Sequence, residues 1–467
     1  MWQLRSIAAD LTGLYRSLGA GLMATALLSL PVTATAEGTV TEPRLWSNEV
    51  RGLAPESPDA ANGLSDAIMK LLTTYAALEI LGPNYRWTTR FYTGGSFEGD
   101  TLNGDLYVYF DGDPKLTIER LWVVLREIRA MGVRHIEGDV VLDGRVFALP
   151  DGLPQIHDNG TNPHRPFLVE PSPVLLHLNL VHFQVRADER GTQAWATPAL
   201  PAITIDNRIT ATEEGPCPSR RRFTWEPVFD NRGNVTVTVE GELPEGCRTT
   251  SYLSLLPQDQ YSGELIISMW QELGGTISGG WRQGVTPSDS RLVSSTTSPD
   301  LVTMIRDINK WSSNVMARQL LITIGAENRH PADNDDRVSG IRAIYDWLEG
   351  KGIDTQGMVI DNGSGLSRHA RMTARQLSAI LTNAWSSPYS ADLMTSMPLT
   401  AMDGTMARRL RDLDMEGMGR IMTGSLQDVR SVAGFTRDDN NTTWAVVGII
   451  NHSPAGKGQS ILDKVLY

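Results

Sequence analysis

Apolar residues recur at intervals of three and four along several stretches, as on the buried face of a helix. The first stretch covers residues 65–81, and Gly82-Pro83 ends it. A second covers residues 118–131 and stops at Gly132. After a long interruption the same spacing returns, and further helices are expected at residues 300–307, 314–324, 337–348 and 373–385.

Segments rich in β-branched and aromatic residues predict strands between and after these helices. The expected strands cover residues 85–92, 105–110, 135–143, 179–185, 234–239, 431–435 and 443–451. Between about residues 144 and 282 the strands are short, and many Pro, Gly and Asn residues separate them. The sequence therefore predicts a mainly β insertion between the first helix and the later helices.

The chain of 467 residues is too long for one typical core and predicts two or more domains. Its beginning carries two arginines, an apolar run at residues 18–30 and the triplet Ala-Thr-Ala at residues 34–36. This order is typical of a secretory signal peptide at residues 1–36, cleaved before Glu37. The alternative is a membrane anchor, but the run is shorter than the roughly 20 residues that span a bilayer. We expect an exported, periplasmic protein, and loose membrane association stays open.

The formal net charge is −12, and no basic block occurs that would neutralise a phosphate backbone. The charge therefore argues against nucleic acid as a partner. His135, His369 and His452 are scattered, without the spacing of metal ligands. The sequence predicts neither a metal site nor a cofactor.

Two cysteines occur, Cys217 and Cys247, and both lie inside the expected insertion. In an oxidising compartment such a pair can close into a disulfide. We expect one disulfide here, and two buried free thiols are the alternative.

The sequence MKLLTTYAALEILGP covers residues 69–83, the end of the first expected helix and the turn after it. Further segments follow it in order, namely GDP at 112–114, GDV at 138–140, INKWSSN at 308–314, NGSGLSR at 362–368 and MDGT at 402–405. Together these segments resemble the motifs of one known family, the D-Ala-D-Ala carboxypeptidase/endopeptidase (penicillin-binding protein 4) family. The segment at residues 69–83 is similar to the helix that carries the family's first motif.

The resemblance implies an α+β fold with a serine β-lactamase/transpeptidase-like domain, an antiparallel sheet with helices on both faces. It also implies a long insertion between the first and second motifs. We expect the transpeptidase-like domain at residues 37–88 and 285–467, with the inserted part at residues 89–284. The mainly β insertion seen in the residue pattern agrees with this organisation.

The family's first motif is Ser-x-x-Lys, whose lysine activates the serine from the same helix face. Here Lys70 is present, but Ala67 stands three residues before it. Alanine offers no nucleophile, so an acyl-enzyme cannot form at that position. No Ser-x-x-Lys occurs elsewhere in the chain, and Ser65, the nearest hydroxyl, is expected to cap the helix.

The second family motif, Ser-x-Asn, is intact at Ser312 and Asn314. The resemblance implies that this serine relays a proton and that the asparagine holds the substrate backbone. The third motif, Lys-Thr-Gly, reads Met422-Thr423-Gly424 and is followed by Ser425. Methionine removes the cation that attracts the substrate carboxylate in the family.

Both losses favour a naturally degenerate family member over a working peptidase. Its expected function is to bind or scaffold the cell wall in peptidoglycan metabolism, with stem peptides or a cell-wall protein as the partner. One alternative is an active serine-type D-Ala-D-Ala carboxypeptidase/endopeptidase with a substitute nucleophile. Another is an oligomer partner that regulates an active relative, and the sequence leaves the oligomeric state open.

Overall fold

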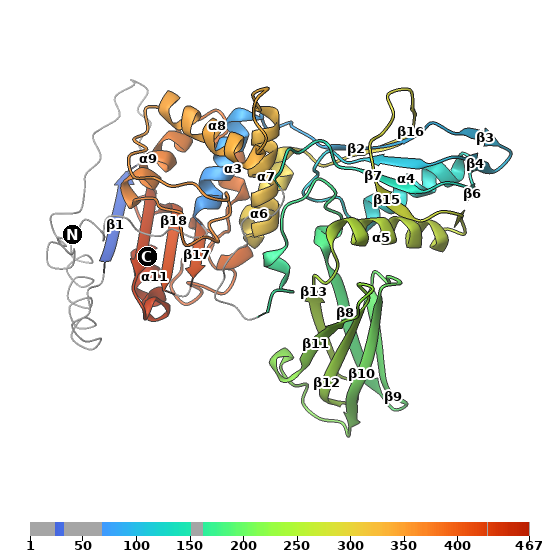
Figure 1. Cartoon of the computed structure of the whole chain (residues 1–467). Coiled ribbons are helices and arrows are strands. Elements are labelled where there is room, and N and C mark those ends of the chain that lie inside the picture. The colour runs from blue at the N-terminus through green and yellow to red at the C-terminus, as the bar shows by residue number, and fades with distance from the viewer. Residues whose placement is uncertain (1–23, 32–67, 151–161, 427, 467) are drawn as a thin grey trace. The chain divides into compact units, whose positions relative to one another are not determined.

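The computed structural model describes residues 24–31, 68–150, 162–426 and 428–466 (Figure 1). They fall into two units, each discontinuous in sequence. The first unit holds the described parts of residues 1–85, 148–159 and 299–467, and the second those of residues 86–147 and 160–298. Residues within each unit contact one another more than they contact the other unit. The expected domain boundaries at residues 88 and 285 stay predictions.

The first unit is built on an antiparallel sheet with the strand order β1-β19-β18-β17. Because residues that face each other in an antiparallel pair share a face, Met422, Ala433 and Val447 lie on the same side of it. The strands are β1 (Ala24–Pro31), β17 (Gly419–Leu426), β18 (Val429–Arg437) and β19 (Thr443–Asn451).

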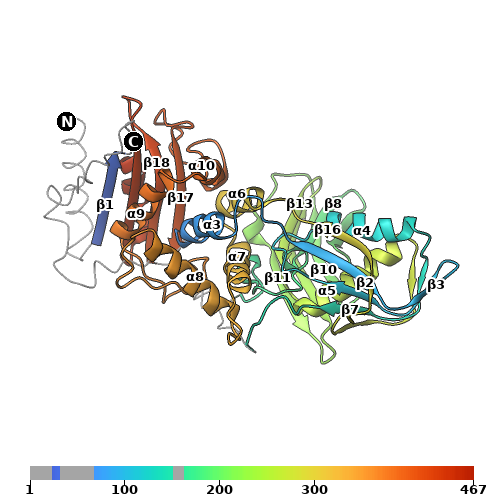
Figure 2. The same ribbon diagram turned by 90° about the horizontal axis from the view of Figure 1, so that it is seen from above.

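Helices cover both faces of this sheet. Trp385 at the end of α9 (Ala374–Trp385) packs against Phe435, with the ring centroids 5.6 Å apart. On the other face, Ile461 of α11 (Gln459–Leu466) joins a buried cluster with Val446. Phe435 pairs with the residue next to Val446, and successive strand residues point to opposite faces. Figure 2 shows α9 alongside β1 and β18.

Helix α3 (Met69–Ile80) is the central helix of the first unit. Residues 69–78 are all buried, and a helix that is buried all round needs protein on every side. The other helices of this layer supply those contacts. They are α6 (Leu301–Trp311), α7 (Asn314–Glu327), α8 (Asp336–Gly350), α9 and α10 (Ser390–Ser396).

The second unit contains a five-stranded mixed sheet with the order β15-β7-β5-β2-β16. The helices α4 (Ile118–Ala130) and α5 (Gln258–Glu272) pack on one face of this sheet, where Phe91 and Val108 join their buried residues. Its strands are β2 (Thr88–Thr93), β5 (Leu106–Tyr109), β7 (Val140–Asp143), β15 (Trp281–Gln283) and β16 (Arg291–Thr297).

Three smaller sheets complete the second unit, with the orders β14-β6-β4-β3, β13-β8-β9 and β10-β12-β11. The first contains β3 (Ser96–Glu98), β4 (Thr101–Asn103), β6 (His135–Ile136) and β14 (Thr276–Ile277). The other two contain β8 (Val181–Asp188), β9 (Gly191–Thr197), β10 (Ile203–Thr212), β11 (Thr224–Phe229), β12 (Val235–Pro244) and β13 (Arg248–Leu253). The predicted β-rich texture of this region is therefore confirmed.

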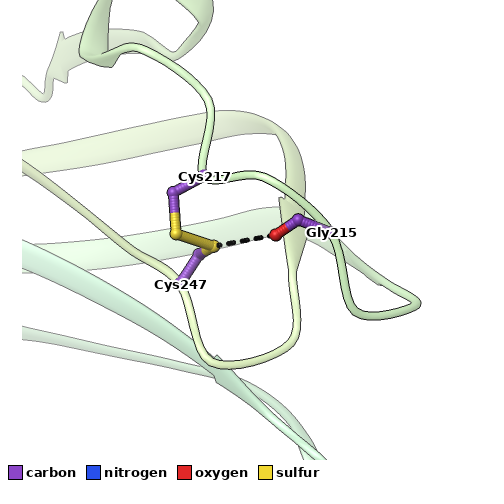
Figure 3. Close-up of a disulfide and its surroundings, with 3 residues drawn as sticks. All are labelled: Gly215, Cys217 and Cys247. Carbon is purple, nitrogen blue, oxygen red and sulfur yellow. Dashed lines mark hydrogen bonds between the residues drawn. A yellow bond between two sulfur atoms is a disulfide. The ribbon is translucent and has the colours of Figure 1, made fainter.

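The expected disulfide is present between Cys217 and Cys247 (Figure 3). The bond links the segment before β11 to the turn between β12 and β13, and it closes a loop of 30 residues in sequence separation. The Sγ atom of Cys247 lies 3.9 Å from the carbonyl oxygen of Gly215. A disulfide sulfur carries no proton, so this approach is a van der Waals contact.

Among the described residues, the helix spacing in the sequence located α3, α4 and α6 to α9 but missed α5, α10 and α11. The buried residues of α5 include Tyr261, Leu265 and Met269, four residues apart, so its signal was present. The Pro- and Gly-rich surroundings favoured strands instead. The strand expected at residues 135–143 is two strands, β6 and β7, which belong to different sheets.

Strand β1 falls inside the stretch predicted to be removed as a signal peptide. It pairs with β19 along all of its 8 residues. The predicted cleavage site before Glu37 lies outside the described residues. Within the part of the chain that the structure describes, no helix is both long and apolar enough to cross a membrane.

Candidate functional site

Lys70 lies in the first turn of α3 and is 1 % exposed. Its Nζ atom donates a hydrogen bond of 2.6 Å to the carbonyl oxygen of Ser364. The N-cap residue of α3 is Ile68, whose side chain forms no capping bond. Ala67, which is expected at the position of the nucleophile, lies outside the described residues, and so does the expected cap Ser65.

The loop at residues 362–366 brings the Ser364 carbonyl to Lys70. Asn362 holds the loop closed, since its Oδ1 accepts from the amide and the hydroxyl of Ser364 at 3.0 and 2.9 Å. Thr73 of α3 donates to the carbonyl oxygen of Gly363 at 2.7 Å. Two hydrogen bonds from one face of α3 therefore fix this loop against the helix.

Ser312 and Asn314 lie where α6 gives way to α7. Ser312 is the C-cap of α6 in the left-handed conformation, with φ 54°. Ser313 is the N-cap of α7 and accepts from the amide of Met316. Asn314 begins α7, and both Ser312 and Asn314 are half-buried. The motif therefore forms the tight turn between two helices that contact α3.

An ion pair joins the end of α6 to the segment before β17. The Nζ atom of Lys310 lies 2.6 Å from Oδ2 of Asp403, and Oδ1 of Asp403 accepts from the amide of Leu399. The next residue, Gly404, has φ +54°, and a Cβ atom there would lie 2.6 Å from the carbonyl oxygen of Lys310. Only glycine allows this close approach of the two segments.

The third motif lies on β17, an edge strand of the sheet in the first unit. Met422 is 1 % exposed and shares the face of the sheet that α9 covers. The hydroxyl of Thr423 donates to that of Thr405 at 2.9 Å. Gly424 is buried, whereas Ser425 is exposed. Met422 thus places a neutral side chain where the family motif has a cation.

The structure places Lys70 on α3, and Ser312 and Asn314 at the turn between α6 and α7, two helices that contact α3. Sequence reasoning missed the carbonyl partner of Lys70 and the pair formed by Lys310 and Asp403. Neither was predictable from spacing, because 294 residues separate Lys70 from Ser364. Among the described residues no group of His, Cys, Asp or Glu side chains could hold a metal ion.

An antiparallel sheet with helices on both faces, interrupted in sequence by the second unit, is a transpeptidase-like fold. The crystal structure of penicillin binding protein 4 (dacB) from Haemophilus influenzae has this fold, with a TM-score of 0.72 and 22% sequence identity. The likeness covers 95% of this chain and 93% of that one.

The chain belongs to the D-Ala-D-Ala carboxypeptidase 3 (S13) family, whose model matches residues 61–464. A D-alanyl-D-alanine carboxypeptidase from an Actinomadura species is 28% identical over 383 residues, which cover 79% of this chain and 69% of the relative. The D-alanyl-D-alanine carboxypeptidase DacB of Haemophilus influenzae is 25% identical over 409 residues, covering 85% and 82%. The resemblance inferred from the motifs is therefore confirmed.

Proposed function

We propose that this member of the family is an exported protein that binds or scaffolds peptidoglycan without cleaving it. The family places the chain in peptidoglycan metabolism. Its lack of catalysis, its export to the periplasm and its binding role are our inference from the residues that replace the family motifs.

The replacement of the nucleophile by Ala67 carries this proposal. Acyl transfer by a serine peptidase starts with a hydroxyl, and Ala67 has none three residues before Lys70. Lys70 retains a structural use, because its ammonium group holds the carbonyl of Ser364 against α3. A structural use explains why the lysine can persist after the serine is lost.

Met422 supports the same conclusion from the side of substrate recognition. A buried methionine cannot form the charge-assisted bond that a lysine gives to a carboxylate, which contributes roughly 1.5 to 3 kcal/mol. The free carboxylate of a stem peptide should therefore bind more weakly at this motif. Ser312 and Asn314 still offer polar groups to a peptide backbone.

Covalent labelling by a fluorescent penicillin tests the loss of catalysis. We expect no label on the natural protein, because the ester needs the missing serine. The double revertant Ala67→Ser, Met422→Lys is expected to be labelled. Adding Lys70→Met to this revertant removes the base and serves as the matched control, which should again be unlabelled.

Labelling of the natural protein would overturn the proposal and require another nucleophile. If the revertant also stays unlabelled, other residues around the three motifs have changed so that the site can no longer react with a penicillin. Cosedimentation of the natural protein with purified peptidoglycan sacculi tests the binding role separately. A protein that stays in the supernatant is not a cell-wall binder.

A further inference from the structure

A polar pocket of about 330 Å³ lies on the second unit, between the strands β2 and β5 and the segment that joins β15 to β16. Arg90 and Tyr92 of β2 and Tyr109 of β5 line it. These residues alternate with Phe91 and Val108, which are buried against α4 and α5. The pocket therefore occupies the face of the five-stranded sheet that these helices leave uncovered.

Arg145 forms a fixed wall of this pocket. Its Nε and Nη2 atoms donate to the two oxygens of Asp143, each at 2.9 Å. The amide of Thr286 donates to the same carboxylate at 2.7 Å. Burial alone would raise the pKa of Asp143, but the bonds from Arg145 and Thr286 outweigh it and hold this pKa below its usual range. The pair is thus charged and rigid, and it contributes no net charge.

Arg90 is the second arginine of the pocket, and no carboxylate of the described residues pairs with it. Its Nη1 atom makes one long hydrogen bond, 3.3 Å, to the carbonyl oxygen of Thr88. Its Cζ atom lies 6.0 Å from the centre of the Tyr109 ring. Asp111 accepts from the amide of Thr88 and does not line the pocket.

The tyrosines add flat faces and hydroxyl groups to this charge. Burial raises the pKa of Tyr109, as do the carboxylates of Asp111 and Asp143, so its phenol keeps the proton that it can donate. The hydroxyl oxygen of Ser290 in the wall is buried and has no partner among the described residues. Rotation of this side chain would present the hydroxyl to a bound group.

The combination of an unpaired guanidinium, ring faces and hydroxyl donors suits a sugar or peptide that carries a carboxylate. Arginine binds carboxylates through two parallel hydrogen bonds. The volume is at the small end of ligand pockets, which fits a group of about one sugar ring. No acidic residue lines the pocket to oppose an anion.

We propose that the pocket formed by Arg90, Tyr92, Tyr109 and Arg145 binds a carboxylate-bearing fragment of the cell wall. The cell wall as the source rests on the proposed function, whereas the preference for a carboxylate rests on the pocket alone. Two sources offer this group, the lactyl carboxylate of an acidic wall sugar and the terminal carboxylate of a stem peptide.

Calorimetric titration of the full exported protein with three probes tests the proposal. N-acetylmuramic acid carries ring and carboxylate, N-acetylglucosamine has the ring alone, and D-Ala-D-Ala has a carboxylate without a sugar. We expect N-acetylmuramic acid or D-Ala-D-Ala to bind at least about tenfold more tightly than N-acetylglucosamine. Which of the two binds identifies the source.

The variant Arg90→Gln should bind the preferred probe about tenfold more weakly or worse. The variant Arg90→Lys should retain only part of the natural affinity. The matched control is Arg126→Gln, an exposed arginine on α4, on the other face of the sheet. Loss of one positive charge there should leave binding unchanged. Equal binding of all probes, no binding at millimolar concentration, or full binding by Arg90→Gln would each overturn the proposal.

Cosedimentation of the same variants with sacculi separates this inference from the proposed function. Sacculus binding that survives Arg90→Gln, combined with no probe binding, would refute the pocket and leave the cell-wall role standing. Probe binding that depends on Arg90, without any sacculus binding by the natural protein, would support the pocket and refute the cell-wall role.

Discussion

At the scale of single residues, the environment of Lys70 gives this side chain a structural role. The ammonium group is buried and donates to the carbonyl of Ser364, and Thr73 donates to the neighbouring carbonyl of Gly363. A buried carbonyl that loses its donor costs about 1 to 3 kcal/mol. The stability of the loop therefore gives a reason to keep Lys70 that is independent of catalysis.

Substitution of Gly363 by alanine should destabilise this arrangement more than the same change at Gly352. Both glycines have positive φ, +72° and +70°, so both variants pay the strain of a left-handed alanine, about 1 to 2 kcal/mol. A Cβ atom at Gly363 would also lie 2.9 Å from Cβ of Leu321, whereas nothing lies within 4 Å at Gly352.

Crowding at Gly363 should add about 1 to 3 kcal/mol to that strain. Urea denaturation of the two single variants measures the difference between them. Equal losses of unfolding free energy would mean that the loop moves away from α3 and α7 without cost.

At the scale of elements, a covalent link joins two segments that flank the strands β11 and β12 in the second unit. The strand β12 pairs with β10 and β11, and the disulfide ties the segment before β11 to the turn after β12. Cys247 is 2 % exposed and packs in a small cluster with Val185 and Leu243. This local cluster is small, so we expect the cross-link to contribute a large part of the stability around β12.

Removal of the disulfide by Cys217→Ala and Cys247→Ala should lower the stability of the second unit by about 3 to 4 kcal/mol. This value follows from the chain entropy of a loop of about 30 residues in the unfolded state. Scanning calorimetry with and without a reductant measures it. A reductant should lower the melting temperature of the natural protein and leave that of the variant unchanged. If the reductant cleaves the bond and the melting temperature of the natural protein stays the same, the expectation is wrong.

At the scale of the whole molecule, the order of the segments matches a transpeptidase-like unit split by an insertion. The first helix and the later helices pack together although nearly the whole second unit lies between them in sequence. Cleavage or retention of the segment before α3 determines where the mature protein begins. Cleavage before Glu37 would remove β1 and leave β19 as an edge strand.

Mass spectrometry of the purified natural protein tests this point. We expect a mature chain that begins at Glu37, because the small residues Ala34 and Ala36 fit a signal-peptidase site. The variant Ala36→Glu blocks the site and should accumulate as the uncleaved precursor. Recovery of the natural protein with residues 24–31 still attached would contradict a cleaved signal peptide and favour an anchored chain.

The sequence alone determined the family and the class of fold, and it predicted the loss of the nucleophile. Local signals suffice for these, because helix spacing, motif order and the identity of residue 67 need no distant contact. It also predicted the cysteine pair, since two cysteines allow only one intramolecular bond. The missed helix α5 had such a signal, which its Pro- and Gly-rich surroundings concealed.

The tertiary structure alone decided which groups meet across the chain. Two contacts join residues that are far apart in sequence, the bond from Lys70 to Ser364 and the ion pair of Lys310 with Asp403. The pocket around Arg90 joins residues from different strands. Their partners depend on how helices and strands pack, and no spacing rule spans such distances. The fold decides which side chains meet at these three sites, whereas the residue types decide which hydrogen bonds and ion pairs can form there.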